Sequence, residues 1–281
     1  MKILIVLSNF LSNDELLTFG GMFAQQTEIP LTVLAVVGSD KESHLADAKK
    51  NLAEAQAKLN LPNLVTKFRI GDLCEQVKHE VEQENFELVI IGERNTSYID
   101  RWIHRFPSAV VAENVPCSAI VFKGKAKPIR RILLCDSGAG RASVLSQFTA
   151  QLARILPGDE NVTILHVMSQ ISAGPGVTGK NLRANTDELI EEHTREGLLV
   201  EADVQALHDL GIHSSPMVRH GLVVDEILAE ARSGDYDLVI VGAHEYQPPK
   251  TFLLENIARQ ILRKINKPIL IVRGNEDFDR K

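Results

Sequence analysis

Short runs of apolar residues, separated by amphipathic stretches, organise the whole chain. The apolar run Leu238–Val241 ends at Gly242, and a second apolar run covers Ile269–Val272. Between them, apolar residues recur every three or four positions from Leu254 to Ile265, which is the spacing of one helix face. Runs that are apolar at every position are typical of parallel strands buried on both faces. This stretch therefore predicts strand, loop, helix and strand in an α/β fold.

The same pattern occurs earlier in the chain, which indicates one unit used twice. The segment FELVIIGERNTSYIDRWIHRFPSAVVAENVPCSAIVFKG parallels YDLVIVGAHEYQPPKTFLLENIARQILRKINKPILIVRG at a constant offset of 150. Glycines keep this offset, in the pairs Gly71 and Gly221, Gly92 and Gly242, and Gly124 and Gly274. At the start of each unit, Ile3-Leu4 pairs with Ile132-Leu133 at an offset of 129. The second copy therefore carries about twenty additional residues before Gly221.

Apolar runs and helical spacing predict the remaining elements of both copies. The expected strands lie at 3–7, 31–37, 65–70, 132–135, 162–168 and 215–219, and the expected helices at 14–26, 43–59, 73–83, 141–156, 187–210 and 225–233. Strands that alternate with helices predict parallel sheets with right-handed crossovers. A basic linker at 123–131 separates the copies. We therefore expect two domains, residues 1–124 and 129–281, each a Rossmann-like open parallel sheet of five strands between helices.

Composition and charge narrow the class of protein. Of the 281 residues, 44% are apolar, which is enough for two cores, and the net charge is -6 with the two signs interspersed. This charge argues against a surface for nucleic acid or anionic membrane. The three cysteines, Cys74, Cys117 and Cys135, lack CxxC spacing and predict buried thiols of a reducing compartment. No run resembles a signal peptide or a membrane span, so we expect a cytoplasmic protein.

Ligands of open parallel sheets bind beyond the carboxyl ends of the strands, where helix N-termini attract anions. In the second copy, Asp136, Ser137 and Gly138 form a small-residue turn from strand to helix at this edge. Asp136 could accept hydrogen bonds from a base amine or a ribose hydroxyl. Alternatively, Asp136 and Ser137 are simply the residue types preferred at helix N-caps. Val167, near the end of the next strand, is included in the candidate site.

A second stretch of the same copy completes the candidate site. Gly242 allows close backbone approach at a strand end, and Asn256 could donate a hydrogen bond to a phosphate. Glu245 and Glu255 would repel that phosphate. His244 has no identifiable orienting partner, which favours an exposed loop residue over a general base. The counterparts in the first copy, where the two arginines could bind an anion or be solvated, are Gly92, Arg94, Asn95, Arg105 and Phe106.

The glycine-rich run from Gly174 to Lys180 matches GxGxxG and nearly matches GxxxxGK[ST]. Both motifs require a loop that leaves a strand and enters a helix directly. Here residues 169–173 separate the strand from the loop, and Asn181 replaces the hydroxyl residue that would bind Mg²⁺. The sequence therefore favours a surface loop over a phosphate site.

Catalytic signatures are absent from the sequence. There is no HExxH, no GxSxG and no His/Cys cluster at metal-ligand spacing. Glu191-Glu192-His193 falls within a charged helical stretch and is typical of a solvated face. We therefore expect no catalytic residues, no metal site and no enzyme.

The two units resemble a tandem universal stress protein over essentially the whole chain. The resemblance is carried by ILLCDSG at the start of the second unit and by DLVIVG…LLENIARQILRKINKPILIV at its end. The resemblance implies two HUP-type domains related by a pseudo-two-fold axis. It also implies pairing through the last strand of each domain, at 120–122 and 269–272, as an intramolecular pseudo-dimer. In that family, Gly-x2-Gly-x9-Gly-Ser/Thr holds the ATP phosphates, and an acidic residue at the end of the first strand holds the nucleoside.

The family pattern carries over only in part. In the second copy, Asp136 fills the acidic position and Gly242 the first glycine, whereas Glu245, Glu255 and Asn256 occupy the later Gly, Gly and Ser/Thr positions. The first copy keeps only Gly92, with Asn95, Arg105 and Phe106 at the later positions and Ser8 at the acidic one. The resemblance thus implies the branch that does not bind ATP in the standard manner, with the first copy the more degenerate.

We therefore expect a non-enzymatic cytoplasmic stress-response protein that acts as a two-lobed binding or adaptor module. Its expected partners are a small ligand, another protein or a second copy in a homodimer. The alternative is a nucleotide-binding switch or weak ATPase that binds ATP or AMP through Asp136, Gly138 and Gly242 of the second domain. A catalytic HUP-type enzyme is disfavoured because the sequence has no SGGxD, HIGH or KMSKS run.

Overall fold

Two compact units make up the computed structural model of the chain. The first unit comprises Met1–Pro128 together with Pro268–Ile271, and the second comprises Ile129–Lys267 with Val272–Lys281. The structure describes residues 1–8, 13–24, 31–93, 107–136, 144–156, 159–168, 186–192, 194–243 and 251–273, with backbone alone at 8, 136, 144, 195, 243 and 251–256. The domains predicted from the sequence, 1–124 and 129–281, include Pro268–Ile271 in the second domain, whereas the structure includes this segment in the first unit.

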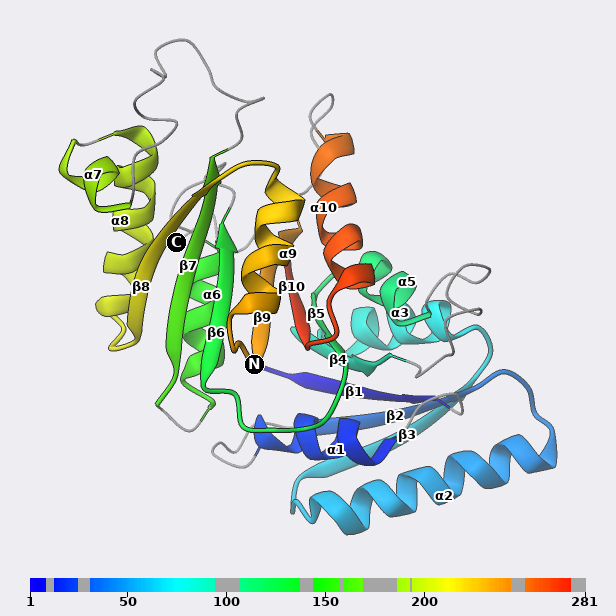
Figure 1. The fold of residues 1–281 in the computed structure, drawn as a ribbon. Helices are drawn as coiled ribbons and strands as arrows, with labels where there is room; N and C mark the ends of the chain where they lie inside the picture. Colours follow the sequence, from blue (N-terminus) through cyan, green and yellow to red (C-terminus); the bar gives the residue numbers. More distant parts are fainter. Residues whose placement is uncertain are drawn as a thin grey trace. The chain divides into compact units, whose positions relative to one another are not determined.

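A parallel sheet in the order β3-β2-β1-β4-β5 forms the first unit. In chain order its elements are β1 (Ile3–Ser8), α1 (Asn13–Met22), β2 (Leu31–Val37), α2 (Glu42–Leu59), β3 (Leu64–Ile70), α3 (Leu73–Glu84), β4 (Leu88–Gly92), α5 (Pro107–Asn114) and β5 (Ser118–Phe122). Helices α1 and α2 pack together on one face, and α3 and α5 on the other (Figure 1). The predicted α/β fold with helices on both faces of a parallel sheet is confirmed.

One strand of the first unit comes from much later in the chain. Strand β10 (Ile269–Arg273) pairs antiparallel with β5, so that Ile269, Leu270 and Ile271 lie opposite Val121, Ile120 and Ala119. The predicted contact between residues 120–122 and 269–272 is thereby confirmed as strand pairing. This pairing is the reason why Pro268–Ile271 belongs to the first unit.

The second unit repeats the arrangement with strands in the order β9-β6-β7-β8, all parallel. Its elements are β6 (Arg131–Asp136), α6 (Val144–Ala153), β7 (Asn161–Met168), α7 (Thr186–Glu191), α8 (Arg195–His208), β8 (His213–His220), α9 (Val223–Ser233), β9 (Leu238–Ala243) and α10 (Thr251–Lys264). Helix α6 packs against α8, and α9 against α10. None of the helices in the described residues is long and apolar enough to cross a membrane.

Burial explains why the central strands are apolar at every position. All residues from Ile3 to Leu7 in β1 are fully buried, and so are Leu238, Val239 and Ile240 in β9. A strand covered by helices on both faces has no solvent side on which a polar residue would be stable. The edge strands β3 and β8 mix polar and apolar residues, and Phe68 on β3 remains 51% exposed.

The single helix predicted at 187–210 is wrong, because the structure has two helices there. Helix α7 ends at Glu191, and α8 begins at Arg195. Thr194 caps α8: its hydroxyl accepts a hydrogen bond from the Gly197 amide at 3.0 Å and donates one to the Leu189 carbonyl at 2.9 Å. A Cβ atom on Gly197 would lie 2.2 Å from that carbonyl oxygen, so the turn requires glycine.

Candidate functional site

The carboxyl edge of the second sheet brings three candidate residues to adjacent strands. Asp136 ends β6 and lies opposite His166 on β7, one residue before Val167. On the other side, Cys135 of β6 lies opposite Val241 of β9, so Gly242 follows at the level of Asp136. Backbone positions of Asp136, Val167 and Gly242 therefore share one edge of three neighbouring strands. This is the edge at which open parallel sheets bind ligands.

The other candidate positions are only partly described. Ser137, Gly138, His244, Glu245 and the loop from Gly174 to Lys180 lie outside the described residues. Asn256 lies in α10, the helix that follows β9, and there the structure gives the backbone alone. In the first sheet, the edge counterparts Arg94, Asn95, Arg105 and Phe106 also lie outside the described residues.

Gly242 has a packing role as well as a place at the edge. A Cβ atom there would lie 3.2 Å from Cδ1 of Leu145, which is in the first turn of α6. The glycine thus lets α6 pack closely on the end of β9. Close helix packing is therefore an explanation for Gly242 that needs no ligand.

A buried hydrogen bond fixes the same turn of α6. The Ser146 hydroxyl donates to Oδ1 of Asp203 on α8 at 2.7 Å, and both residues are almost fully buried. Thr149, one turn later, donates to the Leu145 carbonyl at 2.7 Å. His166 on β7 is also buried. The helix that begins beside the candidate site is thus held by polar contacts within the core.

Sequence reasoning missed this polar cluster, although the repeat contains a signal for it. The run LSQFTAQLA in α6 matches LLTFGGMFA in α1 at the offset of 129, which places Ser146 where the first unit has Leu17. Thr149 likewise corresponds to Gly20. The second unit therefore has polar side chains at two core positions where the first unit has a leucine and a glycine.

The corresponding edge of the first unit carries an ion pair of its own. Nζ of Lys123, directly after β5, lies 2.9 Å from Oε2 of Glu93, directly after β4. The two side chains are 2% and 10% exposed. Here a cation and an anion from the same chain meet at the carboxyl ends of adjacent strands.

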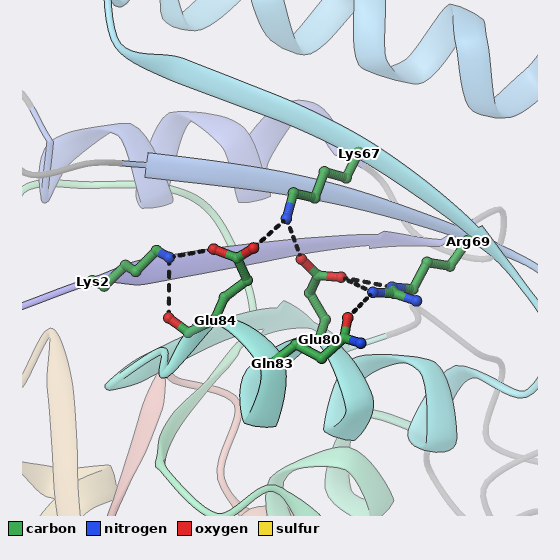
Figure 2. A network of polar contacts seen from close by, with 6 residues as sticks. All are labelled: Lys2, Lys67, Arg69, Glu80, Gln83 and Glu84. Carbon is green, nitrogen blue, oxygen red and sulfur yellow. Dashed lines mark hydrogen bonds and ion pairs between the residues drawn. The ribbon is translucent and has the colours of Figure 1, made fainter.

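A polar network of the first unit lies between β3 and α3 (Figure 2). Glu80 is fully buried and accepts hydrogen bonds from Lys67 Nζ at 2.7 Å and from Arg69 Nε at 2.6 Å. Glu84 accepts from Lys2 at 2.6 Å and from Lys67 at 3.2 Å. Burial alone would raise the pKa of Glu80, but the hydrogen bonds from Lys67 and Arg69 outweigh it and lower that pKa.

This network has a structural explanation. The second unit has the same arrangement, in which Arg219 on β8 pairs with Glu230 on α9. Tyr236 donates a hydrogen bond to Oε1 of Glu230 at 2.7 Å. In each unit these contacts attach the third strand to the following helix. This structural role accounts for the lowered pKa of Glu80, so that shift does not indicate a substrate site.

Within the described residues, the cysteines and the acidic groups show no further site. Cys117 and Cys135 are buried as expected, whereas Cys74 is only half-buried. Burial and the nearby Asp72 carboxylate raise the pKa of the Cys74 thiol, so its thiolate is scarce at neutral pH. Across the described part of the chain, no group of three or more His, Cys, Asp or Glu side chains is arranged to hold a metal ion.

Comparison with known proteins identifies the family. The model of the universal stress protein family matches residues 128–273, more than half of the chain. The chain belongs to the universal stress protein family. Universal stress protein MJ0577 of Methanocaldococcus jannaschii is 28% identical to it over 125 residues, which cover 41% of this chain and 77% of that protein. Family membership supports a role in the stress response.

Solved structures match this universal stress protein over nearly its entire length. A universal stress protein from Archaeoglobus fulgidus superposes with a TM-score of 0.67 at 15% identity, covering 98% of this chain and 97% of that one. The functionally unknown protein PA1789 from Pseudomonas aeruginosa gives a TM-score of 0.69 at 16% identity, covering 99% and 94%. At such low identity the likeness concerns the fold alone, and it extends over both units.

Proposed function

We propose that this universal stress protein is a two-lobed binding module without enzymatic activity, built from two family domains in tandem. In this proposal the second unit binds a small ligand at the carboxyl edge of β6, β7 and β9. The observation that carries the proposal is the convergence of Asp136, Val167 and Gly242 on that edge. A carboxylate at the end of the first strand suits hydroxyl or amine groups of a ligand, as a nucleoside would offer.

The ligand is not ATP bound in the manner usual for the family. Glu245 and Glu255 take positions where the family pattern has glycine, and their charge would repel a triphosphate. A ligand with less negative charge suits this edge better. The alternative function, a switch or weak ATPase that binds ATP or AMP in the second unit, uses the same Asp136 and Gly242.

The first unit serves as scaffold and as a candidate surface for a protein partner. Ser8 stands at its acidic position, so it lacks the carboxylate that would hold a nucleoside. We propose that the fused pair acts in the cytoplasm as an intramolecular pseudo-dimer with a pseudo-two-fold axis. A homodimer of the fused chain is the further assembly that this proposal admits.

Native mass spectrometry of the freshly purified full chain tests the proposal first. A thermal-shift screen with adenosine, AMP and ATP-Mg follows, on the wild type and on two matched variants. Asp136→Ala removes the candidate carboxylate of the second unit, and Ser8→Ala changes the equivalent position of the first. We expect a ligand-induced rise of the unfolding temperature that Asp136→Ala abolishes and Ser8→Ala preserves.

Each possible outcome of this screen is informative. A stronger response to ATP-Mg than to adenosine, together with ATP hydrolysis lost in Asp136→Ala, would favour the nucleotide switch. A chain that carries no bound mass and responds to no compound would count against a ligand site in either unit. The remaining function would then be binding of a protein partner.

A further inference from the structure

Three apolar side chains are exposed on β3, the outermost strand of the first sheet. Val65, Phe68 and Ile70 are 44%, 51% and 42% exposed. Among the described residues, β3 pairs with β2 on one side and with no strand on the other. An open strand edge can pair with the backbone of another chain, and apolar side chains beside it favour such pairing. The first unit therefore combines an open backbone edge with apolar surface.

The hydrogen bonds of β3 show which backbone groups face this edge. The Gly71 amide, directly after β3, donates to the Val37 carbonyl of β2 at 2.9 Å. Because backbone direction alternates along a strand, the odd-numbered residues of β3 turn their amides and carbonyls toward β2. The amides and carbonyls of Thr66, Phe68 and Ile70 therefore point away from β2, toward the open edge.

Apolar side chains flank the edge on both faces of the sheet. The Thr66 hydroxyl accepts a hydrogen bond from Gln56 of α2 at 3.3 Å, which places Phe68 on the α2 face as well. Val65 lies on the opposite face with Lys67, whose ammonium group is held by a carboxylate of α3 (Figure 2). A docked helix would cover one face only, whereas an added strand lies beside both. The geometry therefore favours a strand as the occupant.

The second unit protects the equivalent edge with polar residues and a proline. At the offset of 150, Ser215 and His220 stand at the positions of Val65 and Ile70. Pro216 stands at the position of Thr66, so the edge of β8 lacks an amide donor there. Proline and polar side chains are means by which edge strands avoid pairing with other chains.

The insertion of the second unit covers the remaining position. Val218 corresponds to Phe68; its amide donates to the hydroxyl of Thr186 on α7 at 2.9 Å, and its side chain packs against a cluster that contains Leu189 of α7. In the first unit only residues 38–41 separate β2 from α2, so no helix precedes α2 there. The two units thus differ in the protection of their outer strands, and β3 is the open one.

Strand β3 is complementary to itself in one antiparallel register. When Thr66 lies opposite Thr66 of a second copy, Leu64 lies opposite Phe68, and Val65 opposite Lys67. Apolar side chains then meet each other or the aliphatic stem of lysine, and the two threonines form a favourable pair. Registers centred on Lys67 or on Phe68 would place Lys67 opposite a lysine or an arginine, which is unfavourable.

We propose that the open edge of β3 is a docking surface for a second copy of the chain, through an antiparallel β3–β3 pair centred on Thr66. A two-fold axis lets the same surface serve both copies, and the added strand covers Val65 and Phe68 while pairing with the outward backbone groups. The inference gives the homodimer a specific surface. It does not rest on a ligand site in the second unit.

Sedimentation equilibrium of the full chain over micromolar concentrations tests the proposal. We expect a dimer in the wild type, and Phe68→Lys should raise its Kd at least about tenfold, because lysine on an edge strand opposes pairing. Leu222→Lys is the matched control, since Leu222 is 55% exposed but belongs to the N-cap of α9. It should leave the Kd unchanged.

Thr66→Pro copies the proline of the second unit into β3 and removes the central outward amide. It should weaken the dimer at least as much as Phe68→Lys. Should Thr66→Pro fail to fold, Phe68→Lys decides alone, because its exposed side chain is replaced without loss of core packing.

A wild type that stays monomeric at every concentration overturns the proposal and leaves a strand of another protein as the occupant of the edge. A dimer that resists both Phe68→Lys and Thr66→Pro, or that weakens equally in Leu222→Lys, also overturns it. These outcomes are separate from the ligand screen, because neither variant changes the carboxyl edge of the second sheet.

Disulfide cross-linking tests the register. In a pair centred on Thr66, the two Cα atoms of residue 66 lie about 5.5 Å apart, within reach of a disulfide. Ile70→Cys is the control on the same strand, because its two copies would lie about 26 Å apart. Under mild oxidation, Thr66→Cys should form a covalent dimer, and Ile70→Cys should not exceed the background of the wild-type cysteines. Equal cross-linking of the two variants, or none in Thr66→Cys, would overturn this register.

Discussion

Arg69 and Glu80 form a partly buried ion pair between β3 and α3, with 2.5 Å between the guanidinium and the carboxylate. The same relationship recurs 150 residues later between Arg219 and Glu230. Glu80 is fully buried, and the Glu230 side chain is 7% exposed. Each pair attaches the outermost strand of its sheet to the helix that follows. The repeat has therefore preserved a strand-to-helix contact while the ligand edges of the two units diverged.

Loss of the Glu80 charge should destabilise the first unit. In Glu80→Gln the side chain keeps its shape, but Arg69 loses the Glu80 carboxylate and Lys67 keeps only Glu84. We expect a loss of about 2 kcal/mol in the free energy of unfolding, less than for a fully buried pair, because both cations reach solvent in part. Urea-induced unfolding measures it. Glu82→Gln on the same helix breaks only an exposed pair with Lys78 and should cost less than about 0.5 kcal/mol. Equal losses in the two variants would contradict a special role for Glu80.

The network around Glu80 should also make the protein sensitive to acid. The pKa of Glu80 is lowered, since hydrogen bonds from Lys67 and Arg69 outweigh its burial, and the pKa of Glu84 is lowered by hydrogen bonds from Lys2 and Lys67. Lowered carboxyl pKa values mean that the stabilisation is fully present above the unfolded value of about 4.3 and is lost as the pH falls through the folded value.

Stability measured from pH 6 to pH 3 should therefore decline in the wild type and decline less steeply in the double variant Glu80→Gln with Glu84→Gln. Urea titrations at each pH provide the free energies. Parallel curves for the two proteins would mean that other carboxyl groups determine the acid response.

Tyr236 should be the last tyrosine to lose its proton. Burial, together with the hydrogen bond to Glu230, raises the pKa of Tyr236 to about 12. A raised pKa stabilises the fold fully below the unfolded value of about 10, and this contribution is lost as the pH rises toward 12. Absorbance of the phenolate near 295 nm follows the titration of the three tyrosines. Tyr236→Phe should remove the highest step and cost about 1 kcal/mol at neutral pH, through the lost hydrogen bond. If the step at the highest pH in the absorbance titration persists in Tyr236→Phe, that step belongs to another tyrosine.

Gly197 should tolerate no side chain. A Cβ atom would lie 2.2 Å from the Leu189 carbonyl oxygen, which belongs to the backbone and cannot move alone. Gly197→Ala should therefore separate α7 from α8 and cost more than about 2 kcal/mol in thermal unfolding. Gly38→Ala is the matched control, because nothing lies within 4 Å of a Cβ atom there. We expect Gly38→Ala to be neutral or slightly stabilising. A Gly197→Ala protein with wild-type stability would contradict the described turn.

Much of the fold could be predicted because apolar periodicity reports burial directly. Runs such as Leu238–Val241 are apolar because helices cover both sheet faces, so the strands were identified within a few residues. The division between α7 and α8 was missed because it depends on Thr194 and Gly197 contacting Leu189, and helical spacing continues through that turn.

Side-chain partnerships were harder to predict than elements. Ser146 and Asp203 are 57 residues apart, and their hydrogen bond follows only once α6 and α8 are known to pack together. Glu93 and Lys123 offered a better signal, since each directly follows a strand and parallel strand ends meet at one edge. Comparison of the two copies, position by position, would have drawn attention to both pairs.

The antiparallel pairing of Leu270 with Ile120 has a consequence for synthesis of the chain on the ribosome. Residues 1–128 emerge first, yet their sheet is completed only when residues 268–271 have been made. Until then β5 presents an unpaired backbone edge, which can recruit strands of other nascent chains. Joining strands so distant in sequence is also slow, because a long loop must close before the contact forms. A chaperone that holds the early intermediate should therefore raise the yield of folded protein more than one acting after release.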